Sequence, residues 1–375
     1  MRICQLSENC GGCVLRNLND EQYKAYKEST VRKILSHIEQ KEIIFGESIY
    51  IPEGTRRRAS MTFSYSKKCF KLGFNASQSH EIIDCSECAL LTDKLNNNLK
   101  NIRILIEGLC VESFSVKKGK KFISQYINEG EVACCEADNG IDILISVPFE
   151  PELNHRMIIC EQINQCPDII RVSWQKSKTT NVETIIEKSR PLIKNSGVDV
   201  YIPAGTFLQA SQAGEQALIN CVLNYIGDRK GKIADLFCGV GTFTYPLAQI
   251  KGNQILAVDL SAALLEGFRH SVNKNQLMNI QIEAKNLFKY PLDTEELSKL
   301  DIVVFDPPRA GAAAQTAQLA KSKVPIVVAV SCNPYTFVND ANTLISGGYV
   351  LKEVTMIDQF VYSKHTELVA LFEKE

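Results

Sequence analysis

The segment KIADLFCGVGTF, residues 232–243, contains the features that decide the fold of this 375-residue chain. Its first part, residues 232–237, is an apolar run with the length of a buried strand. Gly239 and Gly241 follow directly, and glycines allow a backbone to pass close to a ligand. The pattern predicts a strand that ends at a ligand-binding loop.

Further short apolar runs follow this segment and alternate with amphipathic stretches. The runs cover residues 254–260, 280–286, 301–306 and 325–331. The stretches 261–274 and 312–321 lie between them and have the periodicity of crossover helices. This alternation predicts an α/β fold with a doubly wound parallel sheet.

The end of the chain contains two more predicted strands, 348–358 and 365–374. Only six residues separate them, which is too short for a parallel crossover connection. We therefore expect the last strand of the sheet to run antiparallel.

The first half of the chain is less regular, and its length argues for a second core. Residues 59–74, 122–127 and 141–148 have strand patterns, and 19–40 and 92–108 have helical patterns. We expect a mixed, mainly β domain over residues 1–200, with residues 1–45 as a loop and helix, and the α/β domain over residues 201–375.

The composition and charge of the chain predict its class and the compartment in which it works. With 45% hydrophobic and 23% charged residues, it is that of a globular protein. The absence of a long apolar span or a leader pattern predicts a cytoplasmic protein with no membrane partner. The net charge of −1 does not indicate a nucleic-acid binder, but basic clusters at 54–60, 65–74 and 116–122 predict a phosphate-contacting face.

Polar side chains gather at the carboxyl ends of the predicted parallel strands, where open α/β sheets bind ligands. Asp259 ends the second strand, and its carboxylate can accept hydrogen bonds from both ribose hydroxyls. No third glycine opens a phosphate-binding helix after Gly241, which disfavours a dinucleotide. The edge better suits a nucleoside without a phosphate, such as S-adenosylmethionine.

A thiol and two carboxylates lie at the same edge. Asp306 begins the rigid turn DPPR, and Cys332 follows the strand 325–331. Addition of a thiolate to C6 of a uracil makes C5 nucleophilic enough to accept a methyl group, and a base must then remove the C5 proton. Glu367, at the start of the antiparallel strand, is the first candidate for that base, and His365 is the second.

Together these motifs resemble the RNA uracil-C5 methyltransferase family, whose members form 5-methyluridine in 23S rRNA or tRNA. SCNP resembles the nucleophile motif and implies Cys332, and DQFVYSKHTELVAL resembles the closing segment and implies Glu367 as the base. GTFLQAS implies that Gln209 contacts S-adenosylmethionine. DLFCGVGTF implies that Phe237 lines the methionine side and Asp259 the ribose, and DPPR implies Asp306 as a cofactor or target contact.

The chain departs from the family pattern at several positions. Ser211 stands where the family usually has Asn, Val361 replaces Pro, Tyr362 replaces a common His, and Asn286 replaces a frequent acidic residue beside adenine. These departures affect the fit of the substrate and the cofactor, and none of them removes the nucleophile or the base.

The start of the chain spaces Cys4, Cys10 and Cys13 as C-x5-C-x2-C, a pattern typical of metal ligands. Spacing alone leaves Cys85 and Cys88 open as the fourth ligand, and zinc and iron–sulfur open as the metal. The resemblance implies a [4Fe–4S] cluster with Cys88 as the fourth ligand, fixing the RNA-binding domain. Because tRNA members usually lack these cysteines, it also implies 23S rRNA, in the short form without the N-terminal β-barrel RNA-binding module.

Other functions compete with this interpretation. A tRNA uracil-C5 enzyme shares the motifs, and an RNA cytosine-C5 methyltransferase shares the covalent chemistry but typically has a second cysteine near the fourth motif, which DPPRAG lacks. A non-catalytic iron–sulfur RNA-binding protein is the alternative from another class. We expect a monomer that acts on a uridine in a loop or flipped out of its stack.

Overall fold

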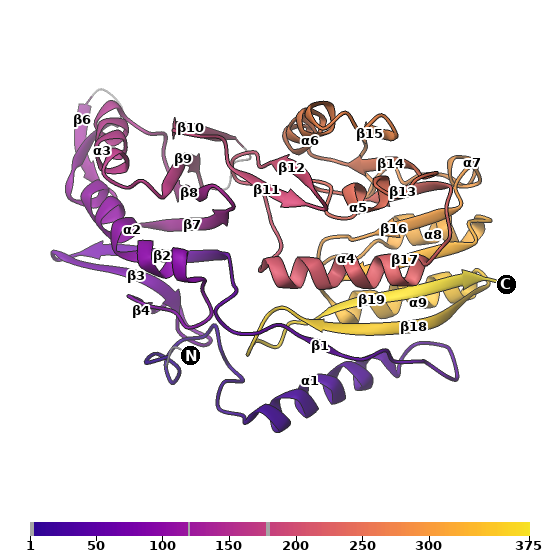
Figure 1. Ribbon diagram of the computed structural model, residues 1–375. Coiled ribbons are helices and arrows are strands. Elements are labelled where there is room, and N and C mark those ends of the chain that lie inside the picture. Colours follow the sequence, from indigo (N-terminus) through magenta and orange to yellow (C-terminus); the bar gives the residue numbers. More distant parts are fainter. Residues whose placement is uncertain (1–3, 119–120, 178–180) are drawn as a thin grey trace. The chain divides into compact units, whose positions relative to one another are not determined.

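The computed structural model describes residues 4–118, 121–177 and 181–375, and the chain divides into two compact units (Figure 1). The first unit comprises Met1–Asn17, Pro52–Ile193 and Ile202–Ser211. The second comprises Leu18–Ile51, Lys194–Tyr201 and Gln212–Glu375. Residues 119 and 120 of the basic cluster 116–122 lie outside the described residues.

Within the described residues, the second unit is built on an eight-stranded sheet in the order β1-β18-β19-β17-β16-β13-β14-β15. The strands are β1 (Ile49–Tyr50), β13 (Lys232–Leu236), β14 (Gln254–Asp259), β15 (Ile280–Ala284), β16 (Ile302–Phe305), β17 (Ile326–Ser331), β18 (Tyr349–Asp358) and β19 (Glu367–Lys374). β13 to β17 pair in parallel, and β19 pairs antiparallel with both β17 and β18. The predicted α/β sheet with an antiparallel last strand is confirmed.

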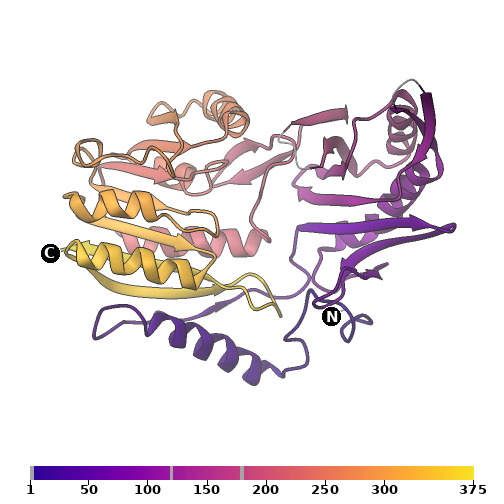
Figure 2. The ribbon, with the colours of Figure 1, turned by 180° about the vertical axis from the view of Figure 1, so that it is seen from behind.

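Helices cover both faces of this sheet. They are α1 (Asp20–Leu35), α4 (Gln212–Ile226), α5 (Thr244–Ala248), α6 (Ala262–Lys274), α7 (Thr294–Leu297), α8 (Ala313–Lys321) and α9 (Pro334–Ser346). One core joins α1, α8 and α9 to the strands, and Figure 2 shows α8 and α9 on that face. A second core on the opposite face joins α4 and α5 to the same strands. The strands are apolar on both sides because both faces are buried.

The first unit contains a seven-stranded mixed sheet in the order β10-β9-β8-β7-β2-β3-β4, within the described part of the chain. These strands are β2 (Arg58–Ser66), β3 (Cys69–Asn75), β4 (Ile82–Asp84), β7 (Glu129–Ala137), β8 (Gly140–Val147), β9 (Ile169–Lys176) and β10 (Val182–Glu187). α2 (Asp93–Val111) and α3 (Leu153–Asn164) pack on the sheet, and β5 (Ser113–Lys118) pairs with β6 (Lys121–Tyr126). β11 (Leu192–Asn195) and β12 (Val198–Tyr201) form a short two-stranded sheet, most of which belongs to the second unit. The mixed, mainly β character agrees with the prediction.

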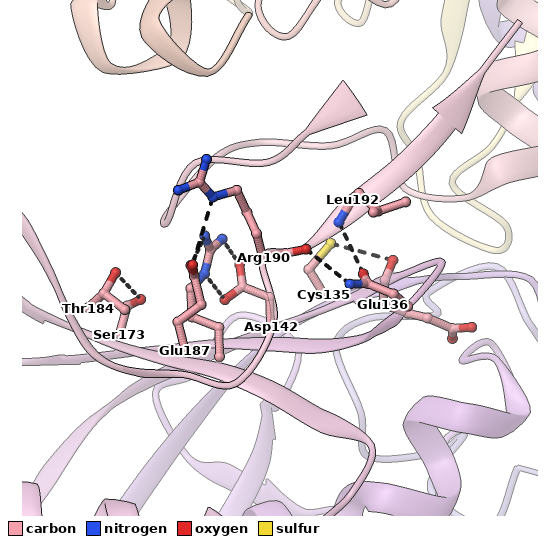
Figure 3. A network of polar contacts seen from close by, with 10 residues as sticks. Cys135, Glu136, Asp142, Ser173, Thr184, Glu187, Arg190 and Leu192 are labelled. Carbon is pink, nitrogen blue, oxygen red and sulfur yellow. Dashed lines mark hydrogen bonds and ion pairs between the residues drawn. The ribbon is translucent and has the colours of Figure 1, made fainter. Parts of the chain in front are cut away.

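A buried ion pair joins the central strands of this sheet (Figure 3). The Arg171 guanidinium donates to both carboxylate oxygens of Asp142, at 2.8 and 2.7 Å, and also contacts Glu187. The Asn139 side chain accepts from the backbone amide of Leu192 at 3.1 Å. These contacts fix the segment that leads from β10 towards β11.

The expected ranges 1–200 and 201–375 require a single boundary at residue 200. In the structure each unit is instead made of three separate segments of the chain. Residues 18–51 belong to the second unit because α1 buries Val31 and Leu35 in the core that contains α9. Residues 202–211 belong to the first unit, where the Ala210 carbonyl accepts from the Arg57 amide at 2.9 Å. Among the described residues, no helix is long and apolar enough to span a bilayer.

Candidate active site

The functional residues predicted for the second unit lie at one edge of its sheet. Asp259 ends β14, and Asp306 and Cys332 each follow directly on a parallel strand, β16 and β17. β19 runs the other way, so that its first residue, Glu367, lies at the same edge. The register pairs Ser331 with Leu368, which places the next pair, Cys332 and Glu367, side by side.

Cys332 is half-buried and carries a protonated thiol at neutral pH. Burial raises its pKa to about 11, and the charges of Glu367 and Asp306 add to the increase, whereas the Arg309 guanidinium opposes it. Asn333 caps α9 through the Tyr335 amide, at 3.2 Å. The nucleophile motif therefore bridges strand and helix, and Arg309 is the neighbouring cation that favours the thiolate.

Glu367 is buried, with 4% of its surface exposed. Burial raises its pKa to about 8, and the charge of Asp306 adds to this, whereas a hydrogen bond from Gln359 opposes it. The Gln359 Nε2 donates to Glu367 Oε1 at 3.0 Å and so fixes the carboxylate. A carboxylate with a pKa near neutrality is well suited to accept a proton from carbon.

The second candidate base, His365, is placed differently. Its side chain is exposed, and its Nδ1 lies 3.2 Å from the Arg309 guanidinium. Burial and the charges of Arg309 and Lys27 lower its pKa. Because the strand register places Glu367, and not His365, beside Cys332, the geometry favours Glu367 as the base.

Asp306 completes this group of acids. Burial raises the pKa of its carboxyl to about 7. Its amide donates to the Leu236 carbonyl at 3.2 Å, which joins the DPPR turn to β13. The Asn333 side chain donates to the Arg309 carbonyl at 2.9 Å, so that the DPPR and SCNP turns are also tied together.

The loop after β13 has the properties of a nucleoside-binding loop. Asp259 Oδ2 accepts from the Gly239 amide at 3.0 Å, and space around Gly239 is open where a side chain would point. Phe237 has φ +61, a conformation that non-glycine residues rarely adopt outside functional turns, and its ring lies 5.4 Å from that of Phe288. Among the described residues, Asp235 Oδ1 is buried and has no hydrogen-bond partner. These features fit S-adenosylmethionine, the cofactor predicted for this edge.

One predicted cofactor residue belongs to the other unit. Gln209 is buried in the first unit, where its carbonyl accepts from Arg57 Nε at 3.2 Å. Its contact with the cofactor therefore stays a prediction.

The structure adds two residues to which the sequence assigned no role. They are Gln359, beside the predicted base, and Asp235, whose pKa burial raises to about 7. Gln359 lies inside the closing motif, next to Asp358, and that position was the only signal for it.

The cysteines predicted as metal ligands gather in the first unit. Burial is the main cause that raises the pKa of Cys13, and the charges of Cys88 and Cys10 raise it further. Burial also raises the pKa of Cys88, and the charges of Cys4 and Cys10 add to that increase. Cys85 is also within reach of Cys4, Cys10 and Cys88. Cys88 thus lies close enough to interact with all three thiols of the C-x5-C-x2-C motif.

Hydrogen bonds directed at the sulfur atoms favour the thiolate form of these cysteines. The backbone amides of Leu90 and Leu91 donate towards the sulfur of Cys88, and Arg16 donates to that of Cys13; both contacts lower the pKa of the thiol. Such donors stabilise metal-bound thiolates. Even so, the part of the chain that the structure describes contains no three His, Cys, Asp or Glu side chains arranged to coordinate a metal ion. The donor type, a group of thiols, is the one that binds iron–sulfur clusters.

Comparisons with known proteins show the family to which this chain belongs. The sequence model of the tRNA (uracil-5-)-methyltransferase family matches residues 193–375. An uncharacterized RNA methyltransferase of Brucella melitensis is 36% identical over 99% of this chain and 84% of its own length. The 23S rRNA (uracil(1939)-C(5))-methyltransferase RlmD of Aliivibrio fischeri is 29% identical over 99% of this chain and 82% of its own.

A solved structure has the same fold. The tRNA (uracil-54, C5)-methyltransferase of Pyrococcus abyssi, in complex with S-adenosyl-L-homocysteine, superimposes with a TM-score of 0.73 at 24% identity. The similarity covers 99% of this chain and 87% of the archaeal chain.

Proposed function

Since this chain belongs to the family of S-adenosylmethionine-dependent RNA uracil-C5 methyltransferases, we propose that it forms 5-methyluridine in 23S rRNA through a covalent bond between Cys332 and uracil C6. The observation that carries the mechanism is the position of Cys332 beside a buried carboxylate, Glu367, at the edge where Asp306 and Asp259 also lie. A nucleophile, a base and a cofactor loop are thereby assembled on adjacent strands.

The chain supplies two chemical steps. The Cys332 thiol loses its proton to solvent, and the thiolate adds to C6, forming an S–C6 bond and moving an electron pair through C5 towards O4. Bound S-adenosylmethionine would supply the electrophilic methyl group that C5 then takes, with S-adenosylhomocysteine as the leaving group. Glu367 removes the C5 proton, the C5=C6 double bond re-forms, and the S–C6 bond breaks to release the thiolate. Asp259 would hold the ribose of the cofactor, Phe237 its methionine side, and Gln209 a further contact.

The choice of 23S rRNA rests on a relative and on the cysteines. The Aliivibrio enzyme, which is named for uracil 1939 of 23S rRNA, matches along almost the whole chain. Cys4, Cys10, Cys13 and Cys88 would hold a [4Fe–4S] cluster, and the cluster would fix the RNA-binding unit. The family model and the archaeal structure are both named for tRNA, so tRNA is the second candidate substrate.

The test is an assay on both RNAs in parallel. Purified protein is incubated with S-adenosylmethionine and unmodified 23S rRNA or tRNA, and the RNA is digested to nucleosides for mass spectrometry. We expect 5-methyluridine in the rRNA alone, and none with Cys332→Ala. Product in tRNA alone, or 5-methylcytidine in either RNA, would contradict the proposed substrate.

A further inference from the structure

Helix α1 holds the loop that precedes the proposed base. This loop, residues 359–366, joins the end of β18 to the start of β19, and α1 belongs to the same unit although it lies more than 300 residues away in sequence. Two side chains one helical turn apart on α1, Tyr23 and Lys27, contact the loop or its ends.

Lys27 spans both ends of the loop. Its Nζ lies 2.8 Å from Asp358 Oδ1 at the end of β18, 2.5 Å from the His365 carbonyl oxygen and 3.4 Å from Thr366 Oγ1. The side chains of Lys27 and Asp358 are 2% and 1% exposed. The buried ammonium group of Lys27 therefore holds the two ends of the loop together.

Tyr23 holds the middle of the loop. Its hydroxyl donates to Asp358 Oδ2 and accepts from the Tyr362 amide at 2.9 Å. The rings of Tyr23 and Tyr362 lie 5.2 Å apart. Tyr362 has φ +59, a conformation that costs free energy unless neighbouring contacts impose it.

Both ends of the loop lead directly to Glu367. Thr366, which Lys27 contacts, precedes Glu367 in the chain. Gln359, which follows Asp358, donates to Glu367 Oε1 at 3.0 Å. A displacement of Asp358 or Thr366 would therefore move the carboxylate of the proposed base or its hydrogen-bond donor.

A buried ion pair is a poor way to gain stability, because desolvation of the two charges largely offsets their attraction. What the pair does provide is a single geometry, since the ammonium and carboxylate lose much free energy in any other arrangement. We propose that Lys27 and Tyr23 are positioning residues for the methylation reaction: from α1 they lock the 359–366 loop so that Glu367 lies in reach of the C5 proton. This inference rests on the proposed function, in which Glu367 is the base.

The proposal predicts a specific defect. Because the polar contacts of Lys27 are with Asp358, His365 and Thr366, a Lys27→Met enzyme should still form the bond to C6 and transfer the methyl group. Removal of the C5 proton should then slow down, and kcat should fall by about 10²-fold with little change in KM for RNA. The methylated protein–RNA adduct should accumulate, and denaturing gel electrophoresis with labelled RNA would detect it.

Three further variants separate positioning from folding. Lys24→Met changes a half-exposed lysine on the same helix, whose ion pair with Asp20 is at the surface, and should turn over like the wild type. Lys27→Met combined with Asp358→Asn removes the unpaired buried charge, so thermal stability should recover while the adduct still accumulates. Tyr23→Phe removes only the hydroxyl and should cause a smaller accumulation.

Wild-type turnover by Lys27→Met, loss of activity without an adduct, or full recovery of turnover in the double variant would each overturn the proposal. A wild-type enzyme that forms no 5-methyluridine would instead contradict the proposed function, so the two failures are distinct.

Discussion

The catalytic edge of the second unit and the cysteine group of the first unit both collect reactive side chains from distant parts of the sequence, but different parts of the backbone hold them. At the catalytic edge, Asp259, Asp306, Cys332 and Glu367 each lie at or directly beside a strand end, and strand register sets their separation. In the cysteine group, Cys10 lies outside the named strands and forms an isolated β-bridge with Ala76. The other predicted ligands of this group lie in turns and loops of the described residues.

The fold alone fixes the positions of the catalytic side chains, whereas the cysteines would reach their final positions only when a metal group binds. A sheet edge holds its side chains in place because the hydrogen-bond ladder behind it is shared with the core. Loops lack that ladder, and metal ligands carried on loops often reach their final positions only when the metal binds. We therefore expect the catalytic edge to withstand changes that dismantle the cysteine group.

The largest expected effect is that of removing the nucleophile. Cys332→Ala should lower formation of 5-methyluridine by at least about 10⁴-fold, because no other group can make the bond to C6. Cys160→Ala, a half-buried cysteine on α3, is the matched control and should remain active. Methyl transfer measured by release of labelled product checks both variants, and substantial activity in Cys332→Ala would remove the covalent mechanism.

Removing the base should have the next largest effect. Glu367→Gln should slow turnover by about 10²–10⁴-fold, because general base catalysis contributes that much. The methylated adduct should then resist denaturation and be visible by mass spectrometry as protein bonded to RNA. Glu373→Gln alters the other end of β19, where the carboxylate contacts Arg229 at the surface, and should turn over normally. Normal turnover by Glu367→Gln would assign the base to another residue.

The sequence predicted contacts between strands better than it predicted the packing of helices. The strand periodicity and the short final connection predicted the sheet and its antiparallel β19, and with them the juxtaposition of Cys332 and Glu367. The partner of α1 could not be predicted, because a helical pattern shows an apolar stripe and not which core covers it. The contacts of Lys27 with Asp358 and His365 were hidden for the same reason. A lysine on a helix is normally exposed, and only the packing of α1 into the core of the second unit buries it.

The pH dependence of the rate should report the buried carboxylate. Burial holds the pKa of Glu367 at about 8, and the base acts only when ionised, so the rate of C5 proton removal should rise about tenfold per pH unit below that value and level off above it. The rate at which the methylated protein–RNA adduct breaks down, measured against pH, reports this step without the ionisation of the Cys332 thiol. A profile that is flat from pH 6 to 9, at roughly constant RNA binding, would exclude Glu367 as the group that limits the reaction.

Stability should change in the opposite direction over the same range. The folded-state pKa of Glu367 lies above its ordinary value of 4.5, so the folded protein holds this proton more tightly than the unfolded chain. The resulting stabilisation is complete below the ordinary value and is lost as pH rises through about 8. Glu367→Gln should therefore melt higher than the wild type at pH 9, by roughly 2–4 °C per kcal/mol of relieved cost. Thermal denaturation at pH 5 and pH 9 tests the sign, because the difference should shrink at the lower pH.

The cysteine group should show the smallest effect on catalysis and the clearest effect on metal content. Anaerobically purified wild-type protein should be brown and contain about four irons per chain, the content of one [4Fe–4S] cluster. Cys88→Ser should lose most of the iron, because Cys88 is the thiol that interacts with Cys4, Cys10 and Cys13 together.

Cys69→Ser, an exposed cysteine on β3 of the same unit, is the matched control and should keep the iron. S-adenosylmethionine binding should be nearly the same in both variants, because most of its proposed contacts, among them Asp259 and Asp306, belong to the second unit. A colourless zinc protein would contradict the cluster. Loss of cofactor binding in Cys88→Ser would show instead that the catalytic edge depends on the cysteine loops, and the distinction between the two regions would then fail.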